Sequence, residues 1–348
     1  MKATKNRIKA LLIEDSAFMR IILSDYLRKD PMIELVGTAS NGKEGFEKTN
    51  LLRPDVVISD MVMPEFDGLY AVKEIMKYCP TPIVVLSSLE KTNPMIFEAL
   101  NAGAVDFFDK PKGNIKDTLD SGGYQLSDLV KSVAEVDEHV LGSISTTEIN
   151  HSHTFDTVAY EVVVIGASTG GPGVTESIIK RLPANLAIPV VIAQHMPERF
   201  LISYAERLNN LTPLTVKVPI NGEELKPYTV YITPGNKNTR VTKRKHANRA
   251  SFSFTEDLYD EYNFPSIDCL FLSAAESFRE KAIGLVLTGM GKDGTIGLKK
   301  IKEAGGITIA QDEASSIIYG MPKSAWESGA ATHQVKLKDI PGFIVSCL

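Results

Sequence analysis

Three residue types that together perform acyl transfer stand at the ends of predicted strands in the second half of the chain. Ser168 lies in a G-x-S-x-G sequence, residues 166–170, that follows the apolar run 162–165. His195 follows a second such run, and Asp293 follows a third. At a sharp turn between a strand and a helix a serine is exposed as a nucleophile, a histidine can take its proton and an aspartate can orient the imidazole. The pattern therefore predicts a serine-centred hydrolytic site.

A second motif in the same region permits a different chemistry. Residues 289–294 form a G-x-G-x-x-G sequence after an apolar run, and Asp312 stands about 20 residues further on, as in dinucleotide-binding turns. A nicotinamide-dependent oxidoreductase is therefore the alternative enzyme. That alternative leaves Ser168 and His195 without a role, and the motif is not in the first βαβ unit, where it usually occurs.

Carboxylates follow two predicted strands in the first half of the chain. Glu14 and Asp15 come after the apolar run 8–13, and Asp60 comes after 56–59. Because the carboxyl ends of parallel strands meet at one edge of a sheet, these acids would repel one another unless a hard cation neutralised them. Oxygen ligands with retained waters suit Mg²⁺. A magnesium site is therefore predicted at this edge.

A hydroxyl and an ammonium group are expected beside these carboxylates. Ser87 and Lys110 end the next two predicted strands. Together with Mg²⁺ they could hold and neutralise the oxygens of a transferred phosphoryl group. Singly, such residues are more often helix caps, turn residues or surface cations, so the prediction depends on their occurrence together at successive strand ends.

Both halves of the chain alternate short β-branched runs with segments of helical periodicity. This pattern predicts parallel sheets covered by helices on both faces. We expect an α/β protein with two doubly wound domains, an N-terminal five-stranded parallel, flavodoxin-like domain at 1–141 and a C-terminal Rossmann-like, mostly parallel domain at 158–348. The Ser/Thr-rich stretch 142–157 between them is predicted to be a linker. The irregular stretch 216–254 is predicted to form hairpins.

Two polar clusters carry weaker signals. His151 and His153 lie in the predicted linker without an acid or thiol nearby, so solvated side chains are favoured over a metal site. The basic stretch 237–249 could dock an acidic helix bundle or nucleic acid, but a solvated hairpin is the favoured interpretation. Neither cluster is expected to carry function.

Composition excludes several classes of protein. The 38 Lys+Arg and 43 Asp+Glu residues give a formal net charge of −5, so bulk electrostatics does not favour nucleic acid as a partner. No apolar run is long enough to insert in a bilayer. The 3 cysteines are far apart in the chain, which fits a reducing compartment. We expect a cytoplasmic monomer.

The strings LLIEDS, DVVISDMVMPEFDGL, VVLSS and AGAVDFFDKP are similar to the receiver domain of two-component response regulators. This resemblance implies that Asp60 accepts a phosphoryl group from a chemotaxis histidine kinase. At the aromatic switch position, where many receivers carry tyrosine, this chain has Phe107, so any swing of the ring would depend on packing. The resemblance implies Glu14, Asp15, Asp60 and the Val62 carbonyl as Mg²⁺ ligands, with Ser87, Lys110 and Phe107 as phosphoryl-contacting or switch residues.

The strings VIGASTGGP, QHMPERF, FPSIDCLFLSAAE and LTGMGKDGTIGLKKIKEAGG resemble the catalytic domain of the chemotaxis protein-glutamate methylesterases. The resemblance implies hydrolysis of γ-glutamyl methyl esters on chemoreceptors with release of methanol, deamidation of certain glutamines, and no cofactor for the esterase. One departure is that Phe264 stands where the family usually has a basic residue. The resemblance implies the triad Ser168, His195 and Asp293, with the Met290 N–H as an oxyanion donor beside the helix-start N–H of Thr169.

The two resemblances together imply regulation of one domain by the other. An unphosphorylated receiver would cover the catalytic rim, and phosphorylation of Asp60 would open it. The implied partners are methylated chemoreceptors and a histidine kinase, without nucleic acid or membrane insertion. The non-enzymatic alternative is a receiver-controlled transcriptional regulator. The second half of the chain has no helix-turn-helix pattern with a basic recognition helix, which disfavours that alternative.

Overall fold

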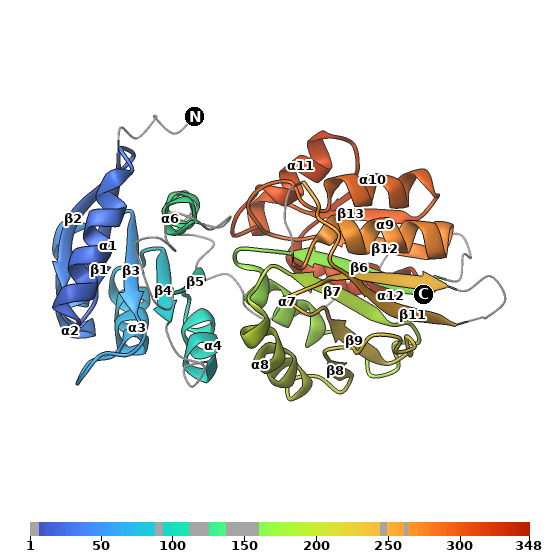
Figure 1. Ribbon diagram of the computed structural model, residues 1–348, viewed down its shortest axis with the longest axis horizontal. Helices are drawn as coiled ribbons and strands as arrows, with labels where there is room; N and C mark the ends of the chain where they lie inside the picture. The colour runs from blue at the N-terminus through green and yellow to red at the C-terminus, as the bar shows by residue number, and fades with distance from the viewer. Residues whose placement is uncertain (1–6, 88–92, 111–124, 137–159, 244–248, 261–263) are drawn as a thin grey trace. The chain divides into compact units, whose positions relative to one another are not determined.

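The computed structural model describes residues 7–87, 93–110, 125–136, 160–243, 249–260 and 264–348. The chain divides into two compact units, residues 1–143 and 144–348, which are treated separately below (Figure 1). The predicted linker 142–157, with His151 and His153, lies outside the described residues. Within the described ranges, no helix combines the length and the apolar character that crossing a membrane requires.

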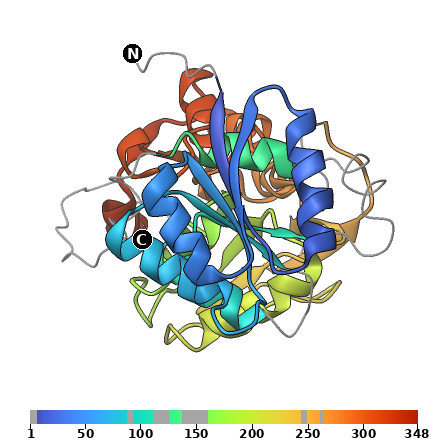
Figure 2. The ribbon, with the colours of Figure 1, turned by 90° about the vertical axis from the view of Figure 1, so that its left-hand side faces the viewer.

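Unit 1 is a parallel sheet with the strand order β2-β1-β3-β4-β5. Figure 2 shows helices on both faces of this sheet, as the alternating pattern predicted. The inner strands β3 and β4 are buried throughout because helices cover both faces of the sheet, whereas the edge strand β2 buries only Ile33 and Ala39. The elements are β1 (Ile8–Ile13), α1 (Ala17–Lys29), β2 (Ile33–Ala39), α2 (Gly42–Leu52), β3 (Val56–Asp60), α3 (Gly68–Tyr78), β4 (Ile83–Ser87), α4 (Asn93–Asn101), β5 (Asp106–Asp109) and α6 (Leu126–Val133).

Unit 2 contains a second parallel sheet, with the order β14-β13-β12-β6-β7-β9-β8. The order reverses beside β6, and open sheets of this kind bind ligands at such a switch point. Its strands are β6 (Val162–Ala167), β7 (Val190–Gln194), β8 (Thr215–Lys217), β9 (Thr229–Ile232), β12 (Ala282–Val286), β13 (Ile307–Gln311) and β14 (His333–Val335).

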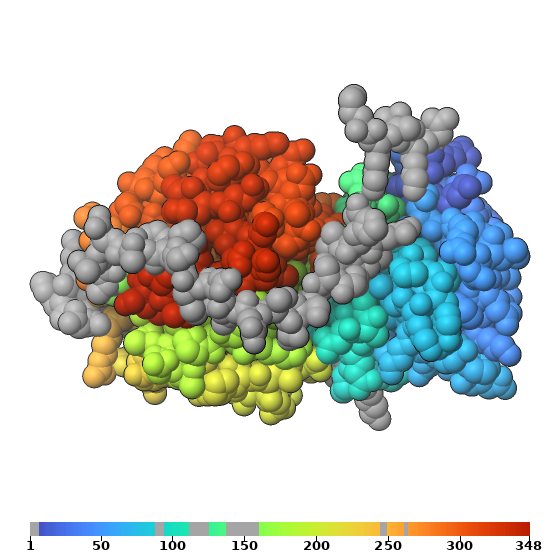
Figure 3. Space-filling model, turned by 180° about the vertical axis from the view of Figure 1, so that it is seen from behind, coloured from blue at the N-terminus to red at the C-terminus, as the bar shows by residue number. Residues whose placement is uncertain are grey.

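Helices cover both faces of the second sheet (Figure 1). The C-terminal elements, red in Figure 3, form part of the surface of this unit, where α12 contacts α7. The two-domain α/β fold class is thus confirmed. The helices are α7 (Gly171–Ile179), α8 (Glu198–Asn209), α9 (Ile267–Phe278), α10 (Thr295–Glu303), α11 (Met321–Glu327) and α12 (Ile340–Ser346), with short 3₁₀ turns η2 (Arg279–Lys281), η3 (Glu313–Ser315) and η4 (Leu337–Asp339).

The stretch predicted to form hairpins is only partly a hairpin. Strands β10 (Asn238–Lys243) and β11 (Ala250–Thr255) pair antiparallel, but β8 and β9 are parallel neighbours in the main sheet. Three cations of the basic stretch that lie in described ranges form ion pairs: Lys237 with Glu256, Lys243 with Glu161, and Arg249 with Glu224. Residues 244–248 of the stretch lie outside the described residues.

Helix α9 is packed against several elements of unit 2. It contacts β6 of the main sheet, β10 of the hairpin and the neighbouring helix α10. Ile267, Leu270 and Phe271 are fully buried in the core cluster of this unit. Burying each such side chain contributes roughly 1.5–3 kcal/mol. This packing fixes the N-terminus of α9 at the carboxyl edge of the sheet.

Candidate functional site

Ser168 occupies the turn between β6 and α7. Its backbone N–H donates to the Thr288 carbonyl at 3.0 Å, which ties the turn to the chain after β12. Gly170 then enters α7 with a φ of 73°, a conformation that favours glycine. The turn therefore holds Ser168 at the carboxyl edge of the sheet, where only 5% of the residue is exposed.

His195 is joined to this turn through the backbone and through one glutamine. The His195 N–H donates to the Ala167 carbonyl at 2.9 Å. The side-chain amide of Gln194, which is buried, donates to the Ser168 carbonyl at 3.0 Å and to the His195 carbonyl at 3.2 Å. One side chain thus links the serine turn to the histidine turn.

Asp293 contacts His195 directly. His195 Nε2 lies 2.8 Å from Asp293 Oδ2, and both side chains are nearly inaccessible to solvent. The same carboxylate accepts three backbone N–H bonds, from Ile267 at 2.8 Å and from Asp268 and Gly294 at 2.9 Å each. These dipoles stabilise a buried negative charge and leave Oδ2 directed at the imidazole.

The geometry assigns different tasks to the two nitrogens of the imidazole. Nε2 faces Asp293, so Nδ1 is the nitrogen that would take the proton of Ser168. A hydrogen bond from the Ser168 hydroxyl to His195 Nδ1 remains a prediction. Such bonds are often long before substrate binds and tighten in the Michaelis complex.

The segment after β12 passes directly beside Ser168. A Cβ built on Gly289 would lie 2.6 Å from Ser168 Cβ, so the backbone approaches there as closely as glycine alone permits. Met290 follows Gly289 in the chain. Thr169, which follows Ser168 in the turn between β6 and α7, is 1% exposed. Their roles as oxyanion donors remain predictions.

Residues 316–321 complete the surroundings of the site, and sequence reasoning assigned them no role. Gly289 N–H donates to the Ile318 carbonyl at 3.0 Å, and Met321 N–H donates to the Gly289 carbonyl at 2.8 Å. Ile317 packs on Gly170, where a Cβ would meet its side chain at 2.8 Å. Gln194 and the N-terminus of α9 were also missed, although a glutamine directly before the histidine and a Ser-x-Asp start to α9 were visible signals.

The acidic residues of unit 1 surround a buried lysine. Lys110 Nζ lies 2.7 Å from Glu14 Oε2 and 2.8 Å from Asp60 Oδ2. Burial raises the pKa of Glu14 above its usual value, and the charge of Lys110 opposes that rise. The β1, β3 and β5 strand ends therefore converge on one polar centre.

The carboxylates fit a divalent cation. One oxygen each of Glu14, Asp15 and Asp60 lie within 4.8 Å of one another, and Asp15 is exposed to solvent. Val62 is adjacent, since its N–H lies 3.5 Å from Asp60 Oδ1. A hard ion with several retained waters suits this partly open oxygen set.

The other residues of unit 1 that were predicted as phosphoryl-contacting or switch residues are buried on the neighbouring strands β4 and β5. Ser87 ends β4 and is 1% exposed, and Phe107, opposite Val85 in the β4–β5 pair, is 6% exposed. Two further polar residues of unit 1 are helix caps. Ser16 caps α1 and Asp67 caps α3 through side-chain hydrogen bonds.

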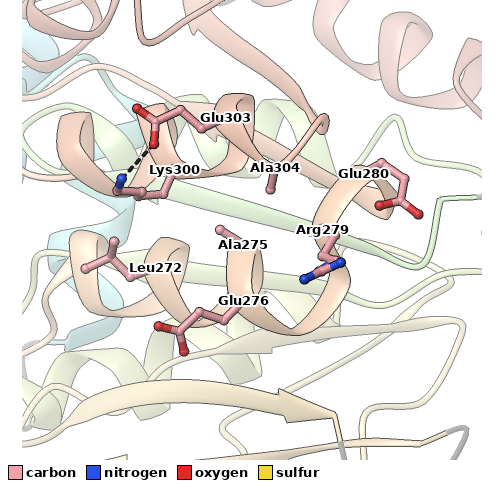
Figure 4. Close-up of a pocket in the computed structure, with 8 residues that line it drawn as sticks. All are labelled: Leu272, Ala275, Glu276, Arg279, Glu280, Lys300, Glu303 and Ala304. Carbon is pink, nitrogen blue, oxygen red and sulfur yellow. Dashed lines mark hydrogen bonds and ion pairs between the residues drawn. The ribbon is translucent and has the colours of Figure 1, made fainter. Parts of the chain in front are cut away.

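A cavity of about 680 Å³ opens between α9 and α10, away from the residues described above (Figure 4). Its rim carries a Lys300–Glu303 ion pair at 2.6 Å. None of Ser168, His195 or Asp293 lines it. The lining residues are Leu272, Ala275, Glu276, Arg279, Glu280, Lys300, Glu303 and Ala304.

Comparison with known proteins identifies the family. The CheB methylesterase family matches residues 163–344, and the response regulator receiver domain matches residues 10–119. The chain belongs to the CheB methylesterase family. A Thermotoga maritima relative is 40% identical over 344 residues, covering 97% of this chain and 98% of the relative. A Desulfitobacterium hafniense relative is 35% identical over 390 residues, covering 100% and 99%.

Both relatives are named protein-glutamate methylesterase/protein-glutamine glutaminase. The crystal structure of the Thermotoga maritima CheB methylesterase catalytic domain is 39% identical to this chain, covers 55% of it and 100% of that domain, and has a TM-score of 0.53. The prediction of an esterase joined to a receiver is thereby confirmed at the level of family. The oxidoreductase alternative is wrong, since residues 289–294 belong to the methylesterase domain.

Proposed function

We propose that this CheB family member hydrolyses γ-glutamyl methyl esters on chemoreceptors and deamidates receptor glutamines. The observation that carries the proposal is the buried His195–Asp293 pair at 2.8 Å, at the strand edge that also holds Ser168. The full-length relatives carry both activities in their names. Both reactions replace the leaving group on the side-chain carbonyl carbon of a glutamyl ester or a glutamine, so one site serves both.

The proposed reaction proceeds through an acyl-enzyme. Ser168 Oγ attacks the ester carbonyl while its proton passes to His195 Nδ1, and Asp293 stabilises the resulting imidazolium. The N–H groups of Met290 and Thr169 receive the oxyanion. The C–O bond then breaks and methanol leaves with the proton from His195. Water, deprotonated by the same imidazole, releases the glutamate; with glutamine the leaving group is ammonia.

Methanol release from methylated receptor membranes tests the reaction. The expected result is one methanol and one new carboxylate for each ester consumed, with a mass increase of about 1 Da for each deamidated glutamine. A purified, folded chain that releases neither methanol nor ammonia from receptors would refute the proposal.

The second part of the proposal is that Asp60 accepts a phosphoryl group from a histidine kinase. Lys110 already contacts Asp60 Oδ2 and would bind the transferred group. Mg²⁺, held by Glu14, Asp15, Asp60 and the Val62 carbonyl, would supply charge neutralisation during transfer. The Ser87 hydroxyl would donate a hydrogen bond to an oxygen of the transferred group, and buried Phe107 would repack in response. We place the activity in the cytoplasm, a choice supported by 3 free cysteines.

We expect Asp60→Asn to abolish Mg²⁺-dependent labelling by acetyl phosphate, because an amide is a poor nucleophile and a weaker cation ligand. The label would be followed as an acid-stable, base-labile adduct. Asp67→Asn is the matched control: Asp67 caps α3 by accepting from Tyr70 N–H at 2.8 Å, and asparagine caps equally well. Persistent labelling of the Asp60 variant would exclude Asp60 as the acceptor.

We expect a fragment that begins at Asp156 to be 10- to 100-fold more active on receptors than the unphosphorylated full chain. That range corresponds to about 1.4–2.8 kcal/mol of coupling between the two domains, which one modest contact supplies. The isolated catalytic domain of the Thermotoga maritima relative is a crystallised unit, so the fragment is a reasonable protein to assay. Equal initial rates for fragment and full chain would show that the receiver does not inhibit.

A further inference from the structure

Asp268 is a buried aspartate in the first turn of α9 that the proposed reaction does not use. It is 4% exposed, and its Oδ1 accepts a hydrogen bond from the Gly297 N–H at 2.7 Å. Gly297 lies in the first turn of α10. The carboxylate of Asp268 therefore joins the N-terminal turns of two adjacent helices.

Asp293 makes the reciprocal connection. It precedes α10 in the chain, and its carboxylate accepts from the N–H groups of Ile267 and Asp268 at the N-terminus of α9. Asp268, which lies in α9, thus binds the N-terminus of α10, and Asp293, which precedes α10, binds the N-terminus of α9. A buried carboxylate is stable only where hydrogen bonds satisfy it, and helix N-termini are favourable places for it. The two helix starts are held as one unit.

The backbones of α9 and α10 meet closely at this point. A Cβ on Gly297 would lie 2.5 Å from Phe271 Cβ and 3.0 Å from the Asp268 carbonyl oxygen. The contact leaves the two helix starts little freedom to slide while the Asp268–Gly297 bond is in place. Loss of that bond would leave a buried N–H without its acceptor, and α9 would shift to relieve it.

A shift of α9 would reach His195 through Asp293. The N–H of Ile267 binds Asp293 Oδ2, the same oxygen that contacts His195 Nε2, and the N–H of Asp268 binds Oδ1. Of the three amides that bind the carboxylate, two therefore belong to the start of α9, whose position depends on Asp268, and the third is that of Gly294. A misplacement of about 1 Å in a catalytic group can lower the rate about 10²-fold.

We propose that Asp268 is a positioning residue for acyl transfer, which keeps Asp293 directed at His195 by locking the N-terminus of α9 onto α10. The inference rests on the proposed function of Ser168, His195 and Asp293. It predicts a change in kcat with little change in KM, because Asp268 is buried and does not meet the substrate.

Three variants of the full chain test the proposal. Asp268→Ala removes the acceptor for Gly297 N–H, and we expect kcat to fall about 10- to 100-fold with KM within about twofold of the original. Asp268→Asn retains an oxygen acceptor, and we expect kcat within about threefold. The control is Ser273→Ala, which removes the acceptor for Val241 N–H from the middle of the same helix. It should lower the thermal midpoint without lowering kcat.

A second measurement tests the role of Asp268 without the proposed receptor substrate. A fluorophosphonate reacts with an activated serine by forming a P–O bond as the P–F bond breaks, with the hydroxyl proton passing to the histidine and fluoride leaving. The rate of Ser168 labelling should fall in Asp268→Ala in the same ratio as kcat. If the original chain is labelled but releases no methanol, the proposed substrate is wrong and the labelling series alone tests Asp268.

The outcomes that would overturn the proposal are specific. A folded Asp268→Ala variant with unchanged kcat and labelling rate would show that Asp268 acts only in stability. Equal losses in Asp268→Asn and Asp268→Ala would show that the acceptor to Gly297 is not what matters. If the alanine variant does not fold, Asp268→Leu, which has the same branching without an acceptor, replaces it, and unchanged labelling in that variant would overturn the proposal.

Discussion

Ser168→Ala should lower methanol release about 10⁶-fold, since loss of the nucleophile in a triad enzyme removes about as much catalysis as loss of the whole triad. That factor corresponds to about 8 kcal/mol of transition-state stabilisation. The fold should survive, because the bonds that hold the turn come from the backbone of Ser168: its N–H donates to Thr288 and its carbonyl accepts from Gln194. The measurement is methanol release from methylated receptor membranes.

The control for this variant is Ser273→Ala. Ser273 is buried to a similar degree, with 4% exposure against 5% for Ser168, but lies within α9 and faces β10. The Ser273→Ala variant should be less stable than the original chain and should release methanol at the original rate. Methanol release by Ser168→Ala within tenfold of the original rate would remove Ser168 from the mechanism.

Asp293→Asn should lower kcat about 10⁴-fold, the effect expected when the histidine is held in the wrong tautomer. Both oxygens of Asp293 accept hydrogen bonds: Oδ2 from Ile267 N–H and His195, and Oδ1 from Asp268 N–H and Gly294 N–H. An amide has one oxygen, so in either orientation its NH₂ group faces a backbone N–H. The site then has an unsatisfied donor as well as an imidazole with the wrong nitrogen protonated.

The same substitution at Asp268 is the matched comparison. Asp268 and Asp293 are both buried acids that accept from the N-terminus of a helix, and Asp293 also contacts His195. The Asp268→Asn variant should keep most of its activity, and the Asp293→Asn variant should be nearly inactive. Activity is measured as kcat and as the rate of fluorophosphonate labelling. Similar losses at both positions would mean that the general loss of buried charge, rather than tautomer control, explains the effect.

The sequence by itself determined the architecture and the positions of the chemical groups. Strands such as β6 and β12 are continuous apolar runs because both faces of a parallel sheet are buried, and that pattern is readable without coordinates. Parallel strands also bring their carboxyl ends to one edge, so Ser168, His195 and Asp293 could be assigned to a common rim. The family resemblance added roles that spacing alone could not assign.

Short edge strands escaped prediction. Strands β8 and β14 each have only three residues, too few to show a period, so β8 was assigned to a hairpin and β14 was not expected. Each lies at an edge of the seven-stranded sheet and pairs with a single neighbour, so its partner is decided by the sheet that is already formed. The patterns of β10 and β11, each of six residues, were long enough for the hairpin prediction to hold there.

Only the tertiary structure decided how the chemical groups are oriented. Three features of the site depend on backbone N–H directions. They are the imidazole nitrogen that meets Asp293, the amides of α9 that bind the Asp293 carboxylate, and the glutamine that joins the serine and histidine turns. Those directions follow from how α9 packs against the sheet, the hairpin and α10. Hydrophobic periodicity specifies which side of a helix is buried, but it carries no information about the angle and height at which two helix starts meet, and those two quantities set the hydrogen bonds of Asp293.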